Sequence, residues 1–425
     1  MRFLTAITAD QFSDNVFRCL AGALPDRLGV AVSGGGDSTA LLVLLADWSA
    51  STGVVLETIS INHGLRPEAA AECQQVADLC VRLKIPHETL CWQDHTKRGN
   101  LQDAARLARQ SLIRDWAGRR NITAVALGHT LDDQAETVLM RLVRGSGVDG
   151  LSAMSERRDD LGLVWIRPLL STRRSTLRDF LVARDIPWSD DPSNDDGKYD
   201  RVRTRKSLAL LEELGCGAKG LAETANRQRT ARDALEIETL KAARAIANVT
   251  ATGDVELDAE GFFALADELQ SRLLAHALKY VSSSPYRPRM RALQSLLEGV
   301  KTDGKAQSLS GCLIARNRKG QIGICREPAA VKTLHCATND IWDNRWAASC
   351  EQTTPDMRIA CLGDAGLQYC PDWRETGHGR ASLMATPAIW QNDRLIAAPL
   401  AGYAQGWSVS LIKGAEHFFS SVLSH

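Results

Sequence analysis

The sequence of this protein contains, at residues 28–45, the stretch LGVAVSGGGDSTALLVLL. Its first five residues form a short uninterrupted run without a charged or polar side chain, as in a buried strand, and its last seven are mostly apolar, as in a buried helix. Between them lies the glycine-rich turn Ser33-Gly34-Gly35-Gly36-Asp37-Ser38. The stretch therefore predicts a strand, a tight loop and a helix in direct succession.

The alternation of strands and helices continues along the first half of the chain. Further strands are expected at residues 54–61, 88–92 and 122–127, and helices at residues 68–83, 101–119 and 136–142. Strands that alternate with helices at this spacing form a parallel sheet with helices on both faces. The predicted fold class of the first half is therefore α/β.

Turn-forming residues crowd together at residues 189–197, SDDPSNDDG, and mark the edge of the first domain. Helical patterns follow, and then a hairpin is expected around the turn at residues 317–320. The length of 425 residues agrees with about two or three domains. We expect three domains: an α/β domain (1–215), a helical linker with a small helical domain (216–304), and a small mixed α/β or β-rich domain (305–425).

The composition is that of an ordinary soluble globular protein, with 44% hydrophobic and 24% charged residues. A formal net charge of zero excludes a uniformly basic coat for nucleic acid but permits a local basic patch. The eleven cysteines include no Cys-x-x-Cys pair, which predicts reduced thiols rather than a zinc or iron–sulfur centre. We expect no signal peptide, no membrane span and a cytoplasmic location.

The glycine-rich turn has the composition of an anion site. A helix that starts directly after a strand presents unpaired backbone N–H groups and the positive end of its dipole. Glycines let the backbone approach phosphates, and Ser33 and Ser38 can donate hydroxyl hydrogen bonds. The turn lacks the Gly-Lys-Ser/Thr ending of a Walker loop. Asp37 would repel a phosphate unless Mg²⁺ bridges the two, so a divalent metal is predicted. The alternative is a turn that only permits tight packing.

A second group of candidate residues lies in the stretch GHTLDDQAET, residues 128–137, after the strand at 122–127. A helix that begins near Asp132 places Asp132, Asp133 and Glu136 on its first turn. Its start lies at the same sheet edge as the glycine loop, where open α/β sheets bind ligands. We therefore predict that Asp37, Asp132, Asp133 and Glu136 are catalytic. The alternative for Asp132 or Asp133 is a helix cap, although a cap needs only one acid.

The glycine loop resembles the signature of the PP-loop ATP pyrophosphatase superfamily, whose members cleave ATP to AMP and pyrophosphate while they adenylate a substrate. Within it, the motif His-x-x-Asp-Asp-x-x-Glu-Thr at residues 129–137 resembles that of the tRNA(Ile)-lysidine synthetase family. The resemblance is close over residues 28–206. It extends to residues 62–66 (NHGLR), Asn100, residues 105–106 and Arg109, residues 144–147 and 150–151, residues 167–169 (RPL) and residues 191–201, and thinly to residues 310–312 and 326–327.

Members of this family modify the wobble cytidine in the CAU anticodon of an isoleucine tRNA. ATP adenylates the ring carbonyl oxygen, and the amine of free lysine then displaces AMP. The resemblance implies ATP and Mg²⁺ as cofactors, tRNA(Ile) and lysine as partners, and a PP-loop fold for residues 1–215. It leaves open which acid binds magnesium, which binds lysine and which is the base. The candidate metal ligands are Asp37 and Asp133. The candidate nucleotide-binding residues are Ser33, Gly34, Gly35, Gly36, Asp37, Ser38, His63, Arg106 and His129.

A local excess of basic residues follows the turn-rich loop, with five cations and one acid, Asp200, between Lys198 and Lys206. Such an excess can neutralise several RNA phosphates, although a solvated helix face is the alternative. Because the resemblance makes residues 191–201 a tRNA-facing element, we predict RNA contacts for Arg201, Arg203 and Arg205. The chain departs from the family here, since Arg201-Val202-Arg203 stands where an Arg-Asn-Arg run is usual. Residues 305–425 are also expected to bind tRNA.

Two other functions compete with this prediction. A PP-loop tRNA thiolation enzyme uses ATP in the same way but generally needs a cysteine pair or cluster, and the chain has no Cys-x-x-Cys. A non-catalytic RNA-binding protein that retains a nucleotide loop has no need for the clustered carboxylates. The sequence leaves open whether the chain acts as a monomer or as a homodimer.

Overall fold

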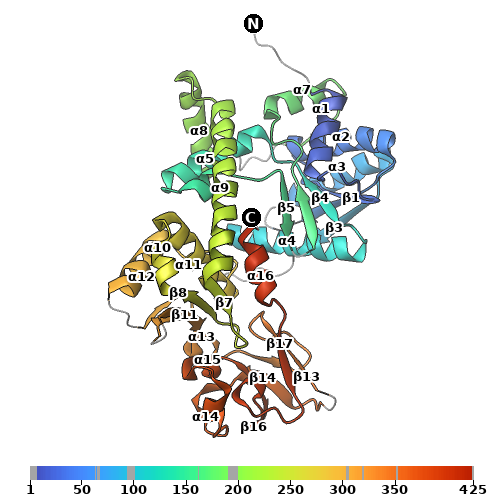
Figure 1. Ribbon diagram of the computed structural model, residues 1–425. Coiled ribbons are helices and arrows are strands. Elements are labelled where there is room, and N and C mark those ends of the chain that lie inside the picture. Colours follow the sequence, from blue (N-terminus) through green and yellow to red (C-terminus); the bar gives the residue numbers. More distant parts are fainter. Residues whose placement is uncertain are drawn as a thin grey trace. The chain divides into compact units, whose positions relative to one another are not determined.

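The chain folds into two units, residues 1–232 and residues 233–424, shown in a computed structural model (Figure 1). The structure describes residues 7–62, 64, 68–92, 101–160, 162–189, 200–302, 306–317, 320–350 and 353–423, without the side chains of residues 101–104, 200 and 201. The division into three domains at residues 215 and 304 stays a prediction.

The first unit contains a six-stranded sheet with the order β3-β2-β1-β4-β6-β5. The first five strands in this order are parallel, and β5 pairs antiparallel with β6. The predicted α/β fold with a parallel sheet is confirmed, but the β5–β6 hairpin was not predicted. The strands are β1 (Arg27–Ala31), β2 (Val55–Asn62), β3 (His87–Cys91), β4 (Ala124–Leu127), β5 (Arg157–Asp160) and β6 (Leu163–Ile166).

Helices cover both faces of this sheet, because its strands are apolar on both sides. One face packs against α1 (Ala9–Cys19), α2 (Gly36–Thr52), α3 (Glu68–Leu83) and α7 (Arg174–Val182), with buried Leu28 and Val30 of β1 between them. The other face packs against α4 (Leu101–Arg119) through Trp116. Trp116 also explains the glycine inside β1, since a Cβ at Gly29 would lie 2.9 Å from its ring. The helix α2 is buried along most of its length, as its apolar sequence predicts.

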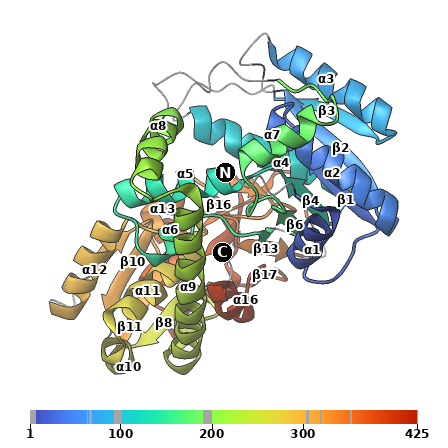
Figure 2. The same cartoon turned by 90° about the horizontal axis from the view of Figure 1, so that it is seen from above.

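A group of helices lies beside the carboxyl edge of the sheet. It consists of α5 (Leu131–Val143), α6 (Val148–Leu151), α8 (Asp200–Glu213) and the first part of α9 (Ala218–Ile246). Ala135 and Val138 of α5 pack against Leu221 and Ala225 of α9, and Figure 2 shows α8 next to α5. This packing fixes α5, whose first turn carries the predicted acids.

The second unit is built on antiparallel sheets. A five-stranded sheet, β7-β8-β11-β10-β9, packs with α10, α11 and α12 around one core. Strands from both sides of residue 304 therefore share a sheet, and β7 and β8 lie in a region predicted to be helical. These elements are β7 (Ala247–Val249), β8 (Val255–Asp258), α10 (Ala259–Ala264), α11 (Asp267–Ser282), α12 (Met290–Thr302), β9 (Gln307–Leu309), β10 (Cys312–Arg316) and β11 (Gln321–Arg326).

The rest of the second unit is rich in short strands, as expected for the end of the chain. A four-stranded sheet, β12-β14-β15-β16, and a pair, β13-β17, enclose two further cores. A buried ion pair between Arg326 and Asp343 ties β11 to this part, with both N–O distances at 2.9 Å. The elements are α13 (Pro328–Val331), β12 (His335–Ala337), β13 (Trp346–Ser349), β14 (Met357–Cys361), α14 (Gly363–Leu367), α15 (Arg380–Met384), β15 (Pro387–Gln391), β16 (Arg394–Ala397), β17 (Ser408–Leu411) and α16 (Ala415–Ser420).

Among the described residues, no helix combines the length and the apolar character that crossing a membrane requires.

Candidate active site

The order of the sheet defines where a ligand is expected. From β1 the chain proceeds outward through β2 and β3, and it then returns to place β4 on the other side of β1. Open α/β sheets bind ligands at the carboxyl ends of the strands where the order reverses in this way. The loop after β1 and the loop after β4 both open at this point, and they carry the two predicted motifs.

The glycine loop after β1 has the conformation that its sequence predicts. Gly34 has φ = +87°, a conformation that favours glycine. Gly35 is the N-cap of α2 and makes no side-chain capping hydrogen bond. Because the first N–H groups of a helix have no partner within it, the start of α2 can bind an anion.

The two serines of the loop differ in their surroundings. The hydroxyl of Ser38 is directed back to the loop: it accepts from the Ser33 backbone N–H at 3.1 Å and donates to the Gly35 carbonyl at 3.0 Å. Ser38 therefore shapes the loop, whereas Ser33, whose Oγ lies 3.2 Å from Ser38 Oγ, is exposed.

Two other segments hold the loop from outside. A Cβ at Gly128, which follows β4, would lie 2.9 Å from Ser38 Cα, so the backbones approach as closely as a glycine allows. On the other side, the Ser189 backbone N–H donates to the Gly34 carbonyl at 2.9 Å. Trp188 lies against the loop, since a Cβ at Gly36 would be 3.3 Å from its Cδ1 atom. Residues 188 and 189, which precede the predicted tRNA-facing element, thus contact the glycine loop, which we also call the phosphate loop.

The first turn of α5 is closed by a capping box. Thr130 is the N-cap, and Asp133 Oδ2 accepts hydrogen bonds from its backbone N–H and its hydroxyl, both at 2.8 Å. Asp133 therefore caps the helix through Oδ2, while its Oδ1 atom is directed into the site. The two interpretations of this acid, cap and site residue, are compatible.

The predicted acids converge on one residue that the sequence did not indicate, Arg174. Its Nε donates to Asp37 Oδ2 at 2.8 Å and its Nη2 to Asp133 Oδ1 at 2.9 Å, while Nη1 lies 3.5 Å from Glu136 Oε1. Its backbone N–H donates to Asp132 Oδ2 at 2.7 Å. Asp132 thus accepts from the first turn of α7, while the other three acids surround the guanidinium. We call Asp37, Asp133, Glu136 and Arg174 the acid cluster.

Burial and the charges of neighbouring side chains together determine the pKa shifts of the acid cluster. Burial raises the pKa of Asp37, against the opposing charge of Arg174. Burial alone would also raise the pKa of Asp133, but the charge of Arg174 and the hydrogen bonds from Thr130 outweigh it and lower this pKa. Burial disfavours the charged form of Arg174, yet Asp133 and Asp37 raise its pKa above the ordinary value. The site is therefore charged, with a cation at its centre.

Two carboxylate oxygens of the cluster remain available. Asp37 Oδ1 and Glu136 Oε2 are buried and accept no hydrogen bond from the described residues. Glu136 has only 2% of its side chain exposed, and its other oxygen accepts from Arg205 Nε at 2.7 Å. A buried anionic oxygen without a partner is unfavourable and marks a place for a cation or a donor.

The predicted tRNA-binding arginines have different surroundings. Arg203 is exposed on α8, whereas Arg205 reaches Glu136, and the side chain of Arg201 lies outside the described residues. Val202, where the family usually has asparagine, is only 5% exposed. The chain therefore places an apolar side chain on the buried side of α8 at this position.

The remaining predicted residues lie around the site with fewer contacts. His129 is half-buried before α5, and its charge contributes to the lowered pKa of Asp133. Arg106 is exposed on α4. Burial, together with the charges of Arg158 and Arg106, lowers the pKa of Arg167 to about 10. His63 lies outside the described residues.

Sequence reasoning missed Arg174, Thr130 and Gly128. Thr130 has a local signal, because a threonine three residues before an acid is typical of a capping box. Gly128 had only its place after a strand, and Arg174 lies 137 residues from Asp37 with no motif around it. In the described residues, no group of three or more His, Cys, Asp or Glu side chains is arranged to hold a metal ion.

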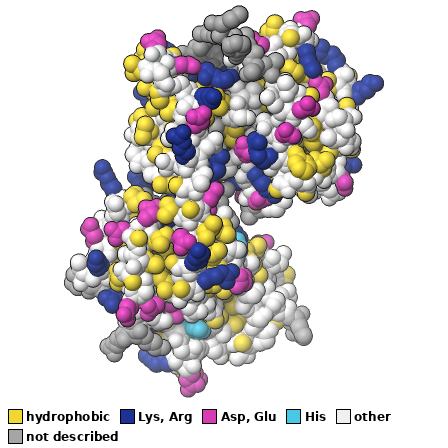
Figure 3. Space-filling model, turned by 45° about the horizontal axis from the view of Figure 1, so that its top comes forward, with side chains coloured by type: hydrophobic (Ala, Val, Ile, Leu, Met, Phe, Trp, Pro, Cys, Tyr) yellow, Lys and Arg dark blue, Asp and Glu magenta, His cyan; other side chains and the backbone are white. Residues whose placement is uncertain are grey.

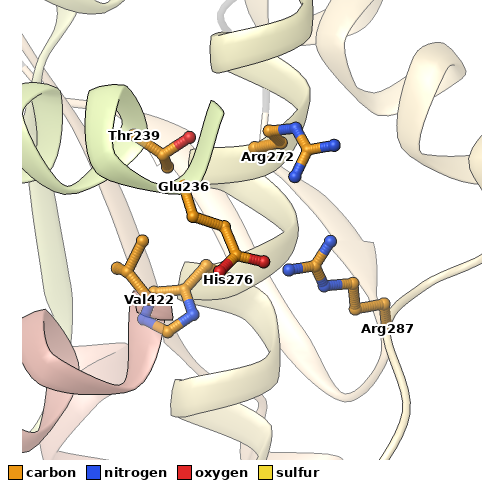
Figure 4. Close-up of a pocket in the computed structure, with 6 residues that line it drawn as sticks. All are labelled: Glu236, Thr239, Arg272, His276, Arg287 and Val422. Atoms are coloured by element: carbon orange, nitrogen blue, oxygen red, sulfur yellow. The ribbon is translucent and has the colours of Figure 1, made fainter. Parts of the chain in front are cut away.

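Basic side chains are not gathered on the face of the molecule in Figure 3, where Lys and Arg are interspersed with Asp and Glu. A cavity in the second unit, shown in Figure 4, measures about 10 Å³, which holds about one water molecule. It is therefore too small for a nucleotide. It is lined by Glu236, Thr239, Arg272, His276, Arg287 and Val422.

The chain resembles proteins of known kind over most of its length. The family model of the PP-loop domain matches residues 8–212. The tRNA(Ile)-lysidine synthase of Ruegeria pomeroyi is 47% identical over 94% of this chain and 95% of that protein. The synthases of Rhodopseudomonas palustris and Methylobacterium nodulans are 39% and 36% identical, over 64% and 75% of this chain and 79% and 96% of theirs.

Among solved structures, the U34-tRNA thiolase NcsA of Methanococcus maripaludis, with its [4Fe-4S] cluster, aligns with a TM-score of 0.45. Its sequence is 17% identical over 51% of this chain and 77% of that chain.

Proposed function

Because the chain belongs to the tRNA(Ile)-lysidine synthase family, we propose that it uses ATP to convert the wobble cytidine of a CAU-anticodon isoleucine tRNA to lysidine. The ring carbonyl oxygen of the cytidine attacks the α-phosphate of ATP, and pyrophosphate leaves. The amine of free lysine then attacks the ring carbon, loses a proton, and expels AMP. The reaction joins carbon to nitrogen, so the enzyme is a ligase.

One observation carries this proposal at the level of the site. Asp37 comes from the start of α2, and Asp133 and Glu136 come from the start of α5, yet all three meet at Arg174. The phosphate loop and the acids of the second motif are thereby parts of one site. An enzyme that first binds the phosphates of ATP and then an amine needs both parts side by side.

The phosphate loop supports the adenylation step. The open start of α2 and the exposed Ser33 offer N–H and hydroxyl donors to the phosphates. As pyrophosphate leaves, negative charge grows on its oxygens, and fixed donors that need no reorganisation stabilise that charge. Gly128 and Ser189 hold the loop in this shape from two sides.

The acid cluster fits a Mg²⁺ ion beside this loop. Magnesium takes oxygen ligands and usually binds through one or two carboxylates together with phosphate oxygens and water. Asp37 Oδ1 is a buried carboxylate oxygen at the start of α2 with no partner among the described residues. We assign Asp37 to the metal. When bound there, Mg²⁺ would neutralise charge on the phosphates during pyrophosphate release.

Glu136 supports the lysine step. Its Oε2 atom is buried and accepts no hydrogen bond from the described residues, while Arg205 and Arg174 donate to Oε1. A carboxylate fixed in this way can pair with an ammonium group of lysine or accept the proton of the attacking amine. An amine attacks only when it is deprotonated, so a base or desolvation is required at this position. Asp132 has a positioning role, because it accepts from the backbone of α7.

The test is incorporation of labelled lysine. The protein is incubated with ATP, Mg²⁺, isotopically labelled lysine and an isoleucine tRNA with a CAU anticodon, and the tRNA is digested and searched for labelled lysidine. We expect one label per tRNA, with stoichiometric AMP and pyrophosphate, and none with a GAU anticodon in the same tRNA. Absence of label from protein that still binds ATP would contradict the proposal. Label from a sulfur donor instead would support a thiolation enzyme.

A further inference from the structure

The position of Arg174 in the acid cluster has a chemical consequence. The guanidinium contacts Asp37 and Asp133 at hydrogen-bond distance and lies near Glu136, in the place where a metal ion and an amine would bind. An arginine side chain keeps its charge under all ordinary conditions. The negative charge of the acids is therefore partly balanced in the free protein by a guanidinium that does not lose its charge by deprotonation.

The backbone of Arg174 is held firmly. The residue starts α7, whose Leu177 and Leu181 are fully buried against α2, and Asp132 accepts from its backbone N–H. The guanidinium is at the end of a long side chain, and 21% of this side chain is exposed. The backbone of Arg174 is thus fixed, while its guanidinium can exchange one carboxylate partner for another.

The cluster has more negative than positive charge. The carboxylates of Asp37, Asp133 and Glu136 form their printed ion pairs with Arg174 and Arg205, so three acids share two guanidinium groups. The charge of Asp132 also acts on Asp37, and that of His129 acts on Asp133. Asp133 has both oxygens engaged, by Thr130 and by Arg174. Asp37 has one oxygen on Arg174 and the other open. A divalent cation therefore meets the guanidinium as a competitor at Asp37.

We infer that Arg174 is a positioning residue for adenylation, which aligns Asp37 with Asp133 before ATP binds and competes with a divalent cation for Asp37. A Mg²⁺ ion held by Asp37 would repel the guanidinium, because the two carry like charges, and would favour its release from Asp37. Arg174 would then stay paired with Asp133, and the N–H groups released from Asp37 would be available to phosphate oxygens. The inference rests on the proposed ATP and Mg²⁺ site.

The test measures metal binding without nucleotide. Mn²⁺ alone is titrated into the full-length protein and free Mn²⁺ is followed by electron paramagnetic resonance. We expect Arg174→Gln to bind Mn²⁺ about tenfold more tightly than wild type, because a competing charge-assisted hydrogen bond is lost. The Mn²⁺ affinity of Arg174→Lys is expected to lie between those of wild type and Arg174→Gln. Lysine keeps the positive charge but lacks the planar guanidinium that contacts two carboxylates at once. Pyrophosphate release falls in both variants.

Two controls make the result specific. Arg178→Gln changes the same residue type one turn further along α7, where the side chain is exposed, and should bind Mn²⁺ as wild type does. The double variant Asp37→Asn with Arg174→Gln should lose the gain in affinity. If Arg174→Gln does not fold, as judged by circular dichroism, Arg174→Lys replaces it, and this variant should also bind Mn²⁺ more tightly than wild type.

Equal or weaker Mn²⁺ binding by the folded Arg174 variants overturns the inference. That outcome is separable from failure of the proposed function, because lysine incorporation is measured independently. A protein that makes no lysidine but shows the Mn²⁺ gain contradicts only the proposed function. A protein that makes lysidine without the gain contradicts only the competition at Asp37.

Discussion

Gly128 and Ser38 approach so closely that a Cβ on residue 128 would lie 2.9 Å from Ser38 Cα and 3.0 Å from its backbone nitrogen. The obstructing atoms belong to the backbone at the start of α2, so a side chain at 128 can be accommodated only if the phosphate loop moves. This contact ties the strand end that carries the second motif to the loop that carries the first.

We therefore predict that Gly128→Ala weakens ATP binding by about tenfold or more, because the loop donors lose their alignment. The measurement is nucleotide titration followed by calorimetry. Gly118→Ala is the matched control: it is helical, a Cβ there meets no atom within 4 Å, and its φ is not positive. The control should keep wild-type affinity and gain up to about 1 kcal/mol of stability. Unchanged ATP affinity in Gly128→Ala would show that the contact does not shape the site.

Asp37 is predicted to be needed for the chemical step. Asp37→Asn keeps the shape of the side chain but removes the charge that we assign to Mg²⁺, and we expect ATP-dependent pyrophosphate release to fall about a hundredfold or more. Asp47→Asn changes the same residue type on the exposed side of the same helix, where Asp47 pairs with Arg184 at the surface. Pyrophosphate release by the control should stay near wild type. Comparable loss in both variants would remove Asp37 from the site.

Arg203 and Arg205 are predicted to have different effects. Arg203→Ala should weaken tRNA binding and reduce the slope of log affinity against log salt by about 0.7, as expected for one lost phosphate contact. Arg205→Ala should lower kcat more than it weakens tRNA binding, because Arg205, although also predicted to contact RNA, holds Glu136 in the site. Filter binding at several salt concentrations and single-turnover lysine incorporation separate the two. A shared loss of tRNA affinity would place both residues at the RNA surface.

His276 is predicted to make the second unit sensitive to acid. Burial lowers the pKa of His276 to about 4, and its Nε2 lies 2.7 Å from the Phe418 carbonyl oxygen. Because the folded pKa lies below the unfolded value of about 6.5, the unfolded state binds the proton more readily, and stability is lost as pH falls from about 6.5 to about 4. The loss between about pH 7 and pH 5 is about 2 kcal/mol.

Asp254 changes stability with pH in the opposite direction to His276. The His276 contribution is therefore measured as a difference between wild type and a His276 variant. Burial raises its pKa to about 6, so its contribution to stability is present at low pH and is lost as pH rises through that value. Denaturant unfolding of wild type and His276→Gln at both pH values cancels the Asp254 contribution, which both proteins share. We expect the variant to lose less stability on acidification. Equal losses in the two proteins would contradict the assigned His276 pKa.

The parts of the fold that the sequence predicted are those with local signals. The β1, glycine loop and α2 succession follows from apolar runs around three glycines, and the acids of α5 lie on a single helical turn. The hairpin of β5 and β6 was missed because β5, with the sequence RRDD, has no apolar alternation. Its Asp160 is held by Arg114 and Arg158, which are contacts of the folded chain.

The centre of the site could not be predicted for the same reason. Arg174 stands in the polar stretch STRRST (residues 171–176), where nothing distinguishes it from Arg173. Only the packing of α7 on α2 brings it to Asp37. The distinct roles of Asp132 and Asp133 also depend on tertiary contacts, since one caps α7 and the other closes the box with Thr130.

The hydrogen bond from Ser189 to Gly34 has a thermodynamic consequence. Ser189 lies two residues before the segment that resembles the tRNA-facing element, and Gly34 belongs to the loop proposed to bind ATP. If engagement of RNA strengthens or strains this bond, the free energy of that change enters the affinity for ATP. By linkage, ATP must then alter the affinity for RNA by the same factor. The affinities for the anticodon and the nucleotide would thus be coupled through the contacts of Trp188 and Ser189 with the glycine loop.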